Sequence, residues 1–202
     1  MDLGIIEFTQ KEGSEEIICK DKGHTLLNFW QWAYSDLVGN TERGALAEYL
    51  VAMACGIVKN PRISWDAYDL ETTEGIKIEV KSSAYIQTWK QKDFSKPVFN
   101  IPESYAWDYK ENLFHNERKR HADVYVFALL AHKEQSTLNP LNLDQWEFYV
   151  LATKQLSEYT RNQKTLSLKS LLKLTNSVHY NCLNEEIIKR NESNKQSDSE
   201  IL

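Results

Sequence analysis

Glu79 and Lys81 lie two residues apart in the segment IKIEVKSS, and side chains at that spacing project from the same face of a β-strand. The apolar residues that alternate with them are expected to point the other way, into a core. Asp69 precedes this strand and supplies a second carboxylate. Hydrolysis of a phosphodiester needs an activated water, a Lewis acid on the phosphate and relief of charge on the leaving oxygen. Two carboxylates beside an ammonium group match that requirement.

The oxygen atoms of this set predict a site for Mg²⁺, with Mn²⁺ as a substitute, because Mg²⁺ is bound in proteins by one or two carboxylates together with waters and phosphate oxygens. Asp69, Glu79 and the backbone carbonyl of Val80 are the candidate ligands. Lys81 on the same face could hold or deprotonate the attacking water, or place a positive charge beside the phosphate.

A hairpin is expected to position these residues, since residues 66–83 read as two strands joined by a turn that contains Gly75. Asp66 competes with Asp69 for the role of the first acid. We prefer Asp69 because it directly precedes the apolar Leu70 at a strand position.

A helix is predicted for residues 41–55, with Thr41 as its cap and Gly56 as its stop. Glu48 is the only charged residue between positions 44 and 58 and lies on the face of small residues. A carboxylate in such a helix must be neutralised, paired or bound to metal if it is buried. The alternative is a surface glutamate on the solvent face of an apolar helix.

The remaining pattern is helices, then strands, then helices, which indicates an α/β or α+β fold with a mixed central β-sheet flanked by helices. A single domain is expected over residues 1–183, followed by a polar tail, 184–202, that begins as a short helix. Residues 102–122 are predicted to be irregular. Helices are expected from Thr25 to about residue 39, after Thr153 and near 167–174, and strands at 97–101, 123–130 and 146–152.

Composition places the 202-residue chain among ordinary globular proteins, and its net charge of −5 gives no global basic signature. Local basic patches remain compatible with DNA binding. Cys19, Cys55 and Cys182 have no metal-ligand spacing, so we expect reduced thiols in a cytoplasmic protein. We expect neither a signal peptide nor a membrane span, and the chain has no glycine-rich nucleotide motif.

Asp69, the Glu79-Val80-Lys81 strand and the helical Glu48 together resemble the PD-(D/E)XK nuclease superfamily, which has the restriction-endonuclease-like fold. In that core a helix precedes a hairpin that carries the Asp and the Glu-x-Lys. The order of elements here looks like that core over about residues 41–152. Tyr68 stands where the family pattern has proline before the acid.

The resemblance implies that Glu48 joins Asp69 and Glu79 at the metal, as in members similar to Holliday-junction resolvases, and that Lys81 is the catalytic lysine. It also implies a substrate or water contact for Gln87, which follows the lysine strand. Arg43 and Lys90 are further candidate phosphate contacts, as are the basic residues 118–120, with a solvated charged face as the alternative.

These observations predict a Mg²⁺-dependent endonuclease that hydrolyses DNA, and cleavage of both strands with one site per chain would favour a homodimer. One alternative is a catalytically silent nucleic-acid-binding module of the same fold. Another is an interaction protein in which Glu79 and Lys81 form an ordinary ion pair.

Overall fold

The computed structural model describes residues 4–18, 23–58, 61–63, 66–108 and 112–199. Cys19, one of the three predicted reduced thiols, lies outside these residues. Within them, Cys55 and Cys182 are free cysteines. No helix in the described ranges is long and apolar enough to cross a membrane.

A four-stranded mixed sheet forms the centre of the molecule, in the spatial order β1-β2-β6-β7. β2 pairs with β1 in antiparallel and with β6 in parallel orientation, and β7 is antiparallel to β6. This sheet and its flanking helices confirm the predicted fold class. The four strands are β1 (Leu70–Glu71), β2 (Lys77–Ala84), β6 (Val124–Leu130) and β7 (Trp146–Ala152).

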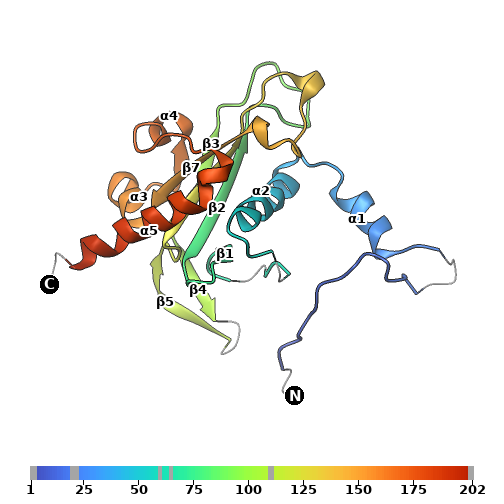
Figure 1. The fold of residues 1–202 in the computed structure, drawn as a ribbon, viewed down its shortest axis with the longest axis horizontal. Coiled ribbons are helices and arrows are strands. Elements are labelled where there is room, and N and C mark those ends of the chain that lie inside the picture. The colour runs from blue at the N-terminus through green and yellow to red at the C-terminus, as the bar shows by residue number, and fades with distance from the viewer. Residues whose placement is uncertain (1–3, 19–22, 59–60, 64–65, 109–111, 200–202) are drawn as a thin grey trace.

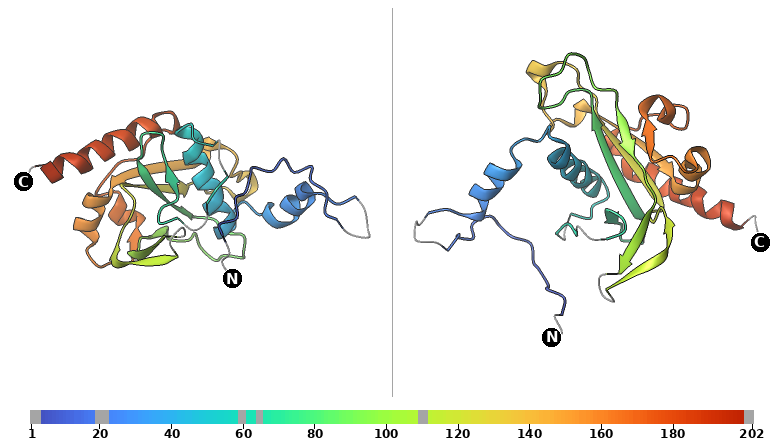
Figure 2. Two further views of the ribbon diagram at one scale, coloured as in Figure 1. Left: turned by 90° about the horizontal axis from the view of Figure 1, so that it is seen from below. Right: turned by 180° about the vertical axis from the view of Figure 1, so that it is seen from behind.

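The two faces of the sheet are covered by different elements (Figures 1 and 2). On one face, α2 and α5 pack over a core that includes Ile78 and Val80 of β2. On the other, α3, α4 and a small two-stranded sheet cover Phe127 and its neighbours. These elements are α2 (Asn40–Ala54), β3 (Val98–Asn100), α3 (Thr153–Thr160), β8 (Thr165–Ser167), α4 (Leu168–Leu171) and α5 (Leu183–Ser199).

The all-apolar segment of β6 is explained by its place between β2 and β7, where all seven residues are buried. The predicted strand at 123–130 is therefore confirmed as a central one. The alternation along β2 is confirmed as well, since Ile78 and Val80 are buried whereas Glu79 and Lys81 are only partly covered.

The prediction that residues 102–122 are irregular is wrong, because a hairpin of β4 (Ser104–Asp108) and β5 (Leu113–Lys119) occupies most of this segment. Every residue of β5 is exposed, so the strand has no buried face and its sequence lacks the alternation that signals a strand. The hairpin extends past one end of the central sheet (Figure 1).

Several element boundaries differ from those predicted. α1 (Leu26–Tyr34) begins after Thr25 as expected but ends five residues before Gly39, has no buried residue, and lies beside the body of the molecule (Figures 1 and 2). Gly39, not Thr41, is the N-cap of α2. Gly56 ends that helix as predicted, with a φ of 70° and its N–H donating to the Met53 carbonyl.

Short 3₁₀ turns complete the described elements, at η1 (Gln135–Thr137), η2 (Leu143–Gln145) and η3 (Tyr180–Cys182). The last turn leads directly into α5, which spans 17 residues where the sequence predicts a short helix. Leu183 and Ile187 at the start of α5 are fully buried against the central sheet.

Candidate active site

Lys81 of β2 lies between two carboxylates. Its Nζ is 2.5 Å from Oε1 of Glu79 and 3.9 Å from Oδ2 of Asp69. β2 holds Glu79 and Lys81 on one face because Ile78 and Val80 are fixed in the core on the other. All three charged side chains are largely but not fully covered, so solvent still reaches them.

Asp69 is fixed by the backbone of β2. Its N–H donates to the Ile78 carbonyl at 3.0 Å, and its Oδ2 accepts from the Val80 N–H at 2.7 Å. Because β1 pairs with only two residues of β2, the Val80 N–H has no strand partner there, and the Asp69 side chain takes that place. Alternate residues of a strand direct their backbone groups to the same side, so the Val80 carbonyl also faces Asp69 rather than β6.

α2 contributes Glu48 to the site of Asp69, Glu79 and Lys81. This glutamate is flanked by Ala47, which packs into the core, and it lines one pocket of about 420 Å³ together with Asp69. Its carboxylate is turned toward Arg62, whose Nη2 donates to Oε1 at 2.9 Å and whose Nε donates to Oε2. The buried glutamate is therefore paired, as the cost of an isolated buried charge requires.

The charges of these groups act on one another. Burial raises the pKa of Glu48, and Asp69 adds to the rise while Arg62 opposes it. Burial and the neighbouring Asp69 likewise raise the pKa of Glu79. Burial alone would lower the pKa of Lys81, but the carboxylates around it outweigh burial and raise it. Lys81 is thus a firmly protonated cation in an excess of negative charge.

The donor set suits a hard divalent cation, because three carboxylates and one backbone carbonyl offer only oxygen ligands. Among the described residues, no group of three His, Cys, Asp or Glu side chains converges into a ready-made metal site as the side chains lie. Arg62 pairs with Glu48 instead, and Lys81 pairs with Glu79 and, at 3.9 Å, with Asp69. Burial and then Asp69 raise the pKa values of Glu48 and Glu79, and this is an electrostatic cost that a bound cation would relieve.

Three of the predicted substrate contacts, Arg43, Gln87 and Lys90, lie at the start of α2 and on the segment after β2. Arg43 is buried at the start of α2, where its Nη1 donates to Oε1 of Gln87 at 3.4 Å and to the Val38 carbonyl at 2.9 Å. Arg43 and Gln87 thus join α2 to the segment after β2. Lys90 is exposed on that segment.

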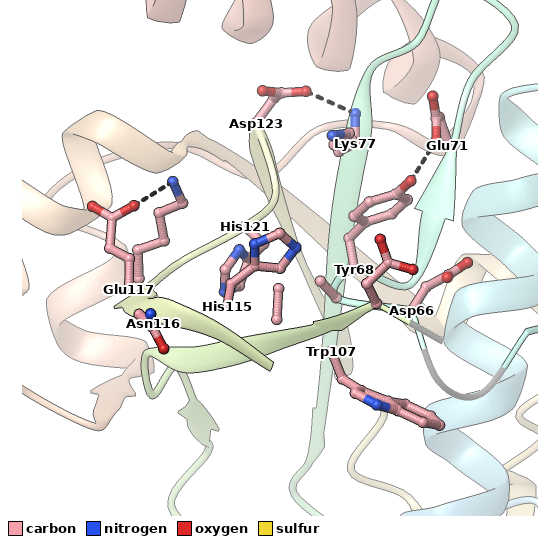
Figure 3. Close-up of a pocket in the computed structure, with 14 residues that line it drawn as sticks. Asp66, Tyr68, Glu71, Lys77, Trp107, His115, Asn116, Glu117, His121 and Asp123 are labelled. Atoms are coloured by element: carbon pink, nitrogen blue, oxygen red, sulfur yellow. Dashed lines mark hydrogen bonds and ion pairs between the residues drawn. The ribbon is translucent and has the colours of Figure 1, made fainter. Parts of the chain in front are cut away.

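A second, larger groove of about 930 Å³ adjoins the site along Lys77, which lies on the same face of β2 as Glu79 and Lys81. Figure 3 shows Tyr68 between Lys77 and Glu71, with Trp107, His115 and His121 along the hairpin side. The Tyr68 hydroxyl donates to Glu71 at 2.5 Å, and the Lys77 ammonium lies 5.2 Å from the centre of the Tyr68 ring. Asp66 lines both the groove and the pocket of Glu48, whereas Asp69 is the acid that contacts Lys81.

Sequence analysis did not identify Arg62 as part of the site. Its segment, residues 59–65, reads as a loop or a short extended piece. The signal available was indirect, since a glutamate alone in an apolar helix requires a cation and Arg62 is among the first basic residues after that helix.

Comparison with known proteins identifies a protein family that this chain matches. Residues 15–170 match the family model described as bacteriophage T4 endonuclease IV, and this range includes Glu48, Asp69, Glu79 and Lys81. A search of curated proteins finds no match. Because the family match spans well over half of the sequence, the chain belongs to the bacteriophage T4 endonuclease IV family and is a nuclease.

Proposed function

We propose that this chain is a Mg²⁺-dependent endonuclease that hydrolyses phosphodiester bonds in DNA through a site of the PD-(D/E)XK type. The observation that carries the proposal is the contact of one lysine, Lys81, with both Asp69 and Glu79, beside the pocket that Glu48 lines. Family membership supports the nuclease activity, and the carboxylate-rich site supports its dependence on a divalent cation.

The order and pairing of elements support the superfamily assignment. α2 precedes an antiparallel pair, β1 and β2, that presents the Asp and the Glu-x-Lys, and β6 then pairs with β2 in parallel. The connection from β2 to β6 differs from the superfamily core. In its described residues it contains β3 and the β4–β5 hairpin and no helix, although a helix is the usual crossover between parallel strands.

Asp69, Glu79 and the Val80 carbonyl would hold the cation, with Glu48 as a further ligand once its carboxylate turns from Arg62. The bound ion would supply a Lewis acid for the phosphate and lower the pKa of a water. Asp69 is already oriented for this role, because its bond to the Val80 N–H fixes one carboxylate oxygen and leaves the other available.

Lys81 acts as a cation in this proposal, since its pKa is raised by the surrounding carboxylates. Its ammonium group donates to Glu79 and, with substrate present, is positioned to donate to a phosphate oxygen or to the attacking water. Removing such a preorganised donor typically lowers kcat by about 10²–10³-fold.

The test is cleavage of a panel of single-stranded, duplex and branched DNA and of RNA, with and without Mg²⁺, by the wild type and Lys81→Ala. We expect the wild type to cleave DNA in a Mg²⁺-dependent reaction. The cleavage rate of Lys81→Ala should be lower by at least about 100-fold. Cleavage that persists in Lys81→Ala would refute the lysine's role, and cleavage of RNA alone would refute the substrate.

Binding of Mn²⁺ by calorimetry, with Glu79→Ala as the control, separates an active enzyme from a silent module. Equal binding by the wild type and Glu79→Ala would show that these carboxylates do not form the metal site. Binding of DNA without cleavage under every metal condition would favour the inactive module.

A further inference from the structure

A strongly basic pocket of about 290 Å³ lies between the base of the β4–β5 hairpin and residues 161–164, and none of the carboxylates of the candidate active site lines it. Four cations line it, and one carboxylate accompanies them: Arg118, Arg120, Arg161 and Lys164, with Glu103. The chain as a whole carries a net charge of −5, so this excess of positive charge is local. Such a concentration of cations predicts a ligand that is an anion.

Arg120 forms the floor of this basic pocket and is held rigidly. Its side chain is 1% exposed, and its guanidinium donates to the carbonyls of Ile101 and Gln163 and to the Ser157 hydroxyl, at 3.1 to 3.2 Å. Its Nη1 also lies 3.6 Å from Glu103. A buried guanidinium with neutral acceptors and one more distant carboxylate retains much of its positive potential.

The other three cations are exposed at the rim of the pocket. Arg118 donates to the backbone carbonyl of Glu103 at 3.0 Å. In the part of the chain that the structure describes, none of Arg118, Arg161 and Lys164 forms an ion pair with a carboxylate. Elsewhere the exposed Lys119 and the part-exposed Arg190 do have such partners. The rim cations are therefore available to an external anion.

Arg161 occupies a backbone position that favours glycine. Its φ of 48° and ψ of −118° belong to the first central position of a tight turn, which the Gln163 N–H closes by donating to the Thr160 carbonyl at 2.9 Å. An arginine is strained there, and strained residues concentrate at functional positions. The turn directs residues 161–164 to the rim of the basic pocket.

The basic pocket and the groove beside the active site share the strand β5. Along β5, residues 115–117 and Lys119 line the groove of Figure 3, whereas Arg118 lines the basic pocket. Tyr125 of β6 lies within electrostatic reach of both sites, because burial and Glu79 raise its pKa while Arg120 opposes them. A chain of phosphates that passes over the hairpin could reach both.

We infer that this basic pocket binds a backbone phosphate of the nucleic-acid substrate at a point remote from the bond that is cut. Arg120 provides the fixed positive floor, and Arg118, Arg161 and Lys164 close on the phosphate from the rim. The inference rests on the proposed function for the identity of the ligand, but it concerns binding and not cleavage. The pocket anchors the strand and leaves the chemical step to the carboxylate site.

The test measures binding without cleavage, using a fluorescein-labelled single-stranded DNA oligonucleotide in buffer with EDTA. We expect Arg161→Gly and Lys164→Ala each to weaken binding by about fivefold and to reduce the slope of log affinity against log salt concentration by about one. Lys173→Ala is the matched control, because Lys173 is exposed but lies outside the pocket. Arg161→Gly is also expected to raise the melting temperature, since glycine removes the strain.

Two outcomes would overturn the inference. One is binding by Arg161→Gly and Lys164→Ala that stays within twofold of the wild type, and the other is absence of wild-type binding in this buffer. Wild type and variants should bind an oligonucleotide with neutral methylphosphonate linkages with equal affinity. An affinity difference that persists with this oligonucleotide would show that the residues contact bases instead. Failure to cleave any substrate would count against the proposed function and leave this binding result intact.

Discussion

Arg62 donates to both carboxylate oxygens of Glu48, one bond from Nε and one of 2.9 Å from Nη2. The arginine side chain is 47% exposed, whereas that of Glu48 is 10% exposed, so the arginine is the partner that can leave into solvent. In the proposed enzyme Arg62 therefore competes with the metal for Glu48. It neutralises the glutamate until a cation takes its place.

Arg62→Ala is predicted to bind Mn²⁺ more tightly than the wild type, by about two- to fivefold, because the competing ion pair of a half-exposed arginine is worth about 1 kcal/mol or less. Isothermal titration calorimetry at pH 8 measures this difference. Lys90→Ala, which removes an exposed cation on the segment after β2, should leave the affinity unchanged. Weaker binding by Arg62→Ala would show that Arg62 assists the metal site rather than competing with it.

The stabilisation that Mg²⁺ gives to the fold is predicted to depend on pH. The pKa values of Glu48 and Glu79 are both raised above 4.5, first by burial and then by Asp69. When folding raises the pKa of a carboxyl, that group stabilises the fold at pH values below its pKa in the unfolded state. This stabilisation is lost as the pH rises through the pKa of the folded state. The metal-free protein should therefore lose stability over that window, and Mg²⁺ should restore it.

Melting temperatures between pH 4.5 and 8, with and without Mg²⁺, test this linkage. The increase caused by Mg²⁺ should be largest at pH 8 and should shrink as the pH falls through the raised pKa values, because protons then compete with the metal. The difference should disappear in Glu79→Gln and persist in Glu117→Gln, a change at an exposed glutamate. An increase independent of pH would contradict the assignment of these carboxylates.

Ile187→Ala is predicted to destabilise the protein by about 2–5 kcal/mol, because Ile187 is fully buried between α5 and the central sheet. The adjacent Ile188 is 37% exposed, so Ile188→Ala is the matched control and should cost less than about 1 kcal/mol. Urea unfolding measures both. Equal losses at the two positions would mean that α5 does not pack as the structure shows.

α5 also shows why part of the fold escapes sequence analysis. Its first turns contain only a few apolar residues among many charged ones, as in a frayed helix, yet Leu183 and Ile187 suffice to dock it on β7. The sequence predicts β6 to within one residue, because burial on both faces of this strand leaves an uninterrupted apolar run. The β4–β5 hairpin has no buried face on β5 and so leaves no such pattern.

Part of the candidate site can likewise be predicted from the sequence, and part cannot. Glu79 and Lys81 lie close together because side chains two residues apart share one face of a strand. The structure brings Asp69 to Lys81 across the turn at Gly75, whose φ is 79°. Arg62 and the residues of the basic pocket come from segments that are distant in sequence or irregular. Their proximity depends on tertiary packing, which no local spacing encodes.

The choice between Asp66 and Asp69 gives a final prediction. Asp69 accepts a hydrogen bond from the Val80 N–H at 2.7 Å and lies 3.9 Å from the Lys81 ammonium, whereas Asp66 lines the wall shared by the pocket of Glu48 and the adjoining groove. Asp69→Asn keeps an acceptor for Val80 but removes the charge, so the fold should survive.

We expect Asp69→Asn to weaken Mn²⁺ binding by at least about tenfold and to lower cleavage in proportion, because a charged ligand is lost from the site. Asp66→Asn should change Mn²⁺ affinity by less than about twofold, since the carboxylate that accepts from the Val80 N–H and lies beside the Lys81 ammonium is that of Asp69. Calorimetry on the two variants, with melting curves to establish that both are folded, decides the question. The reverse order of effects would transfer the role of first acid to Asp66 and would require the segment before β1 to rearrange when metal binds.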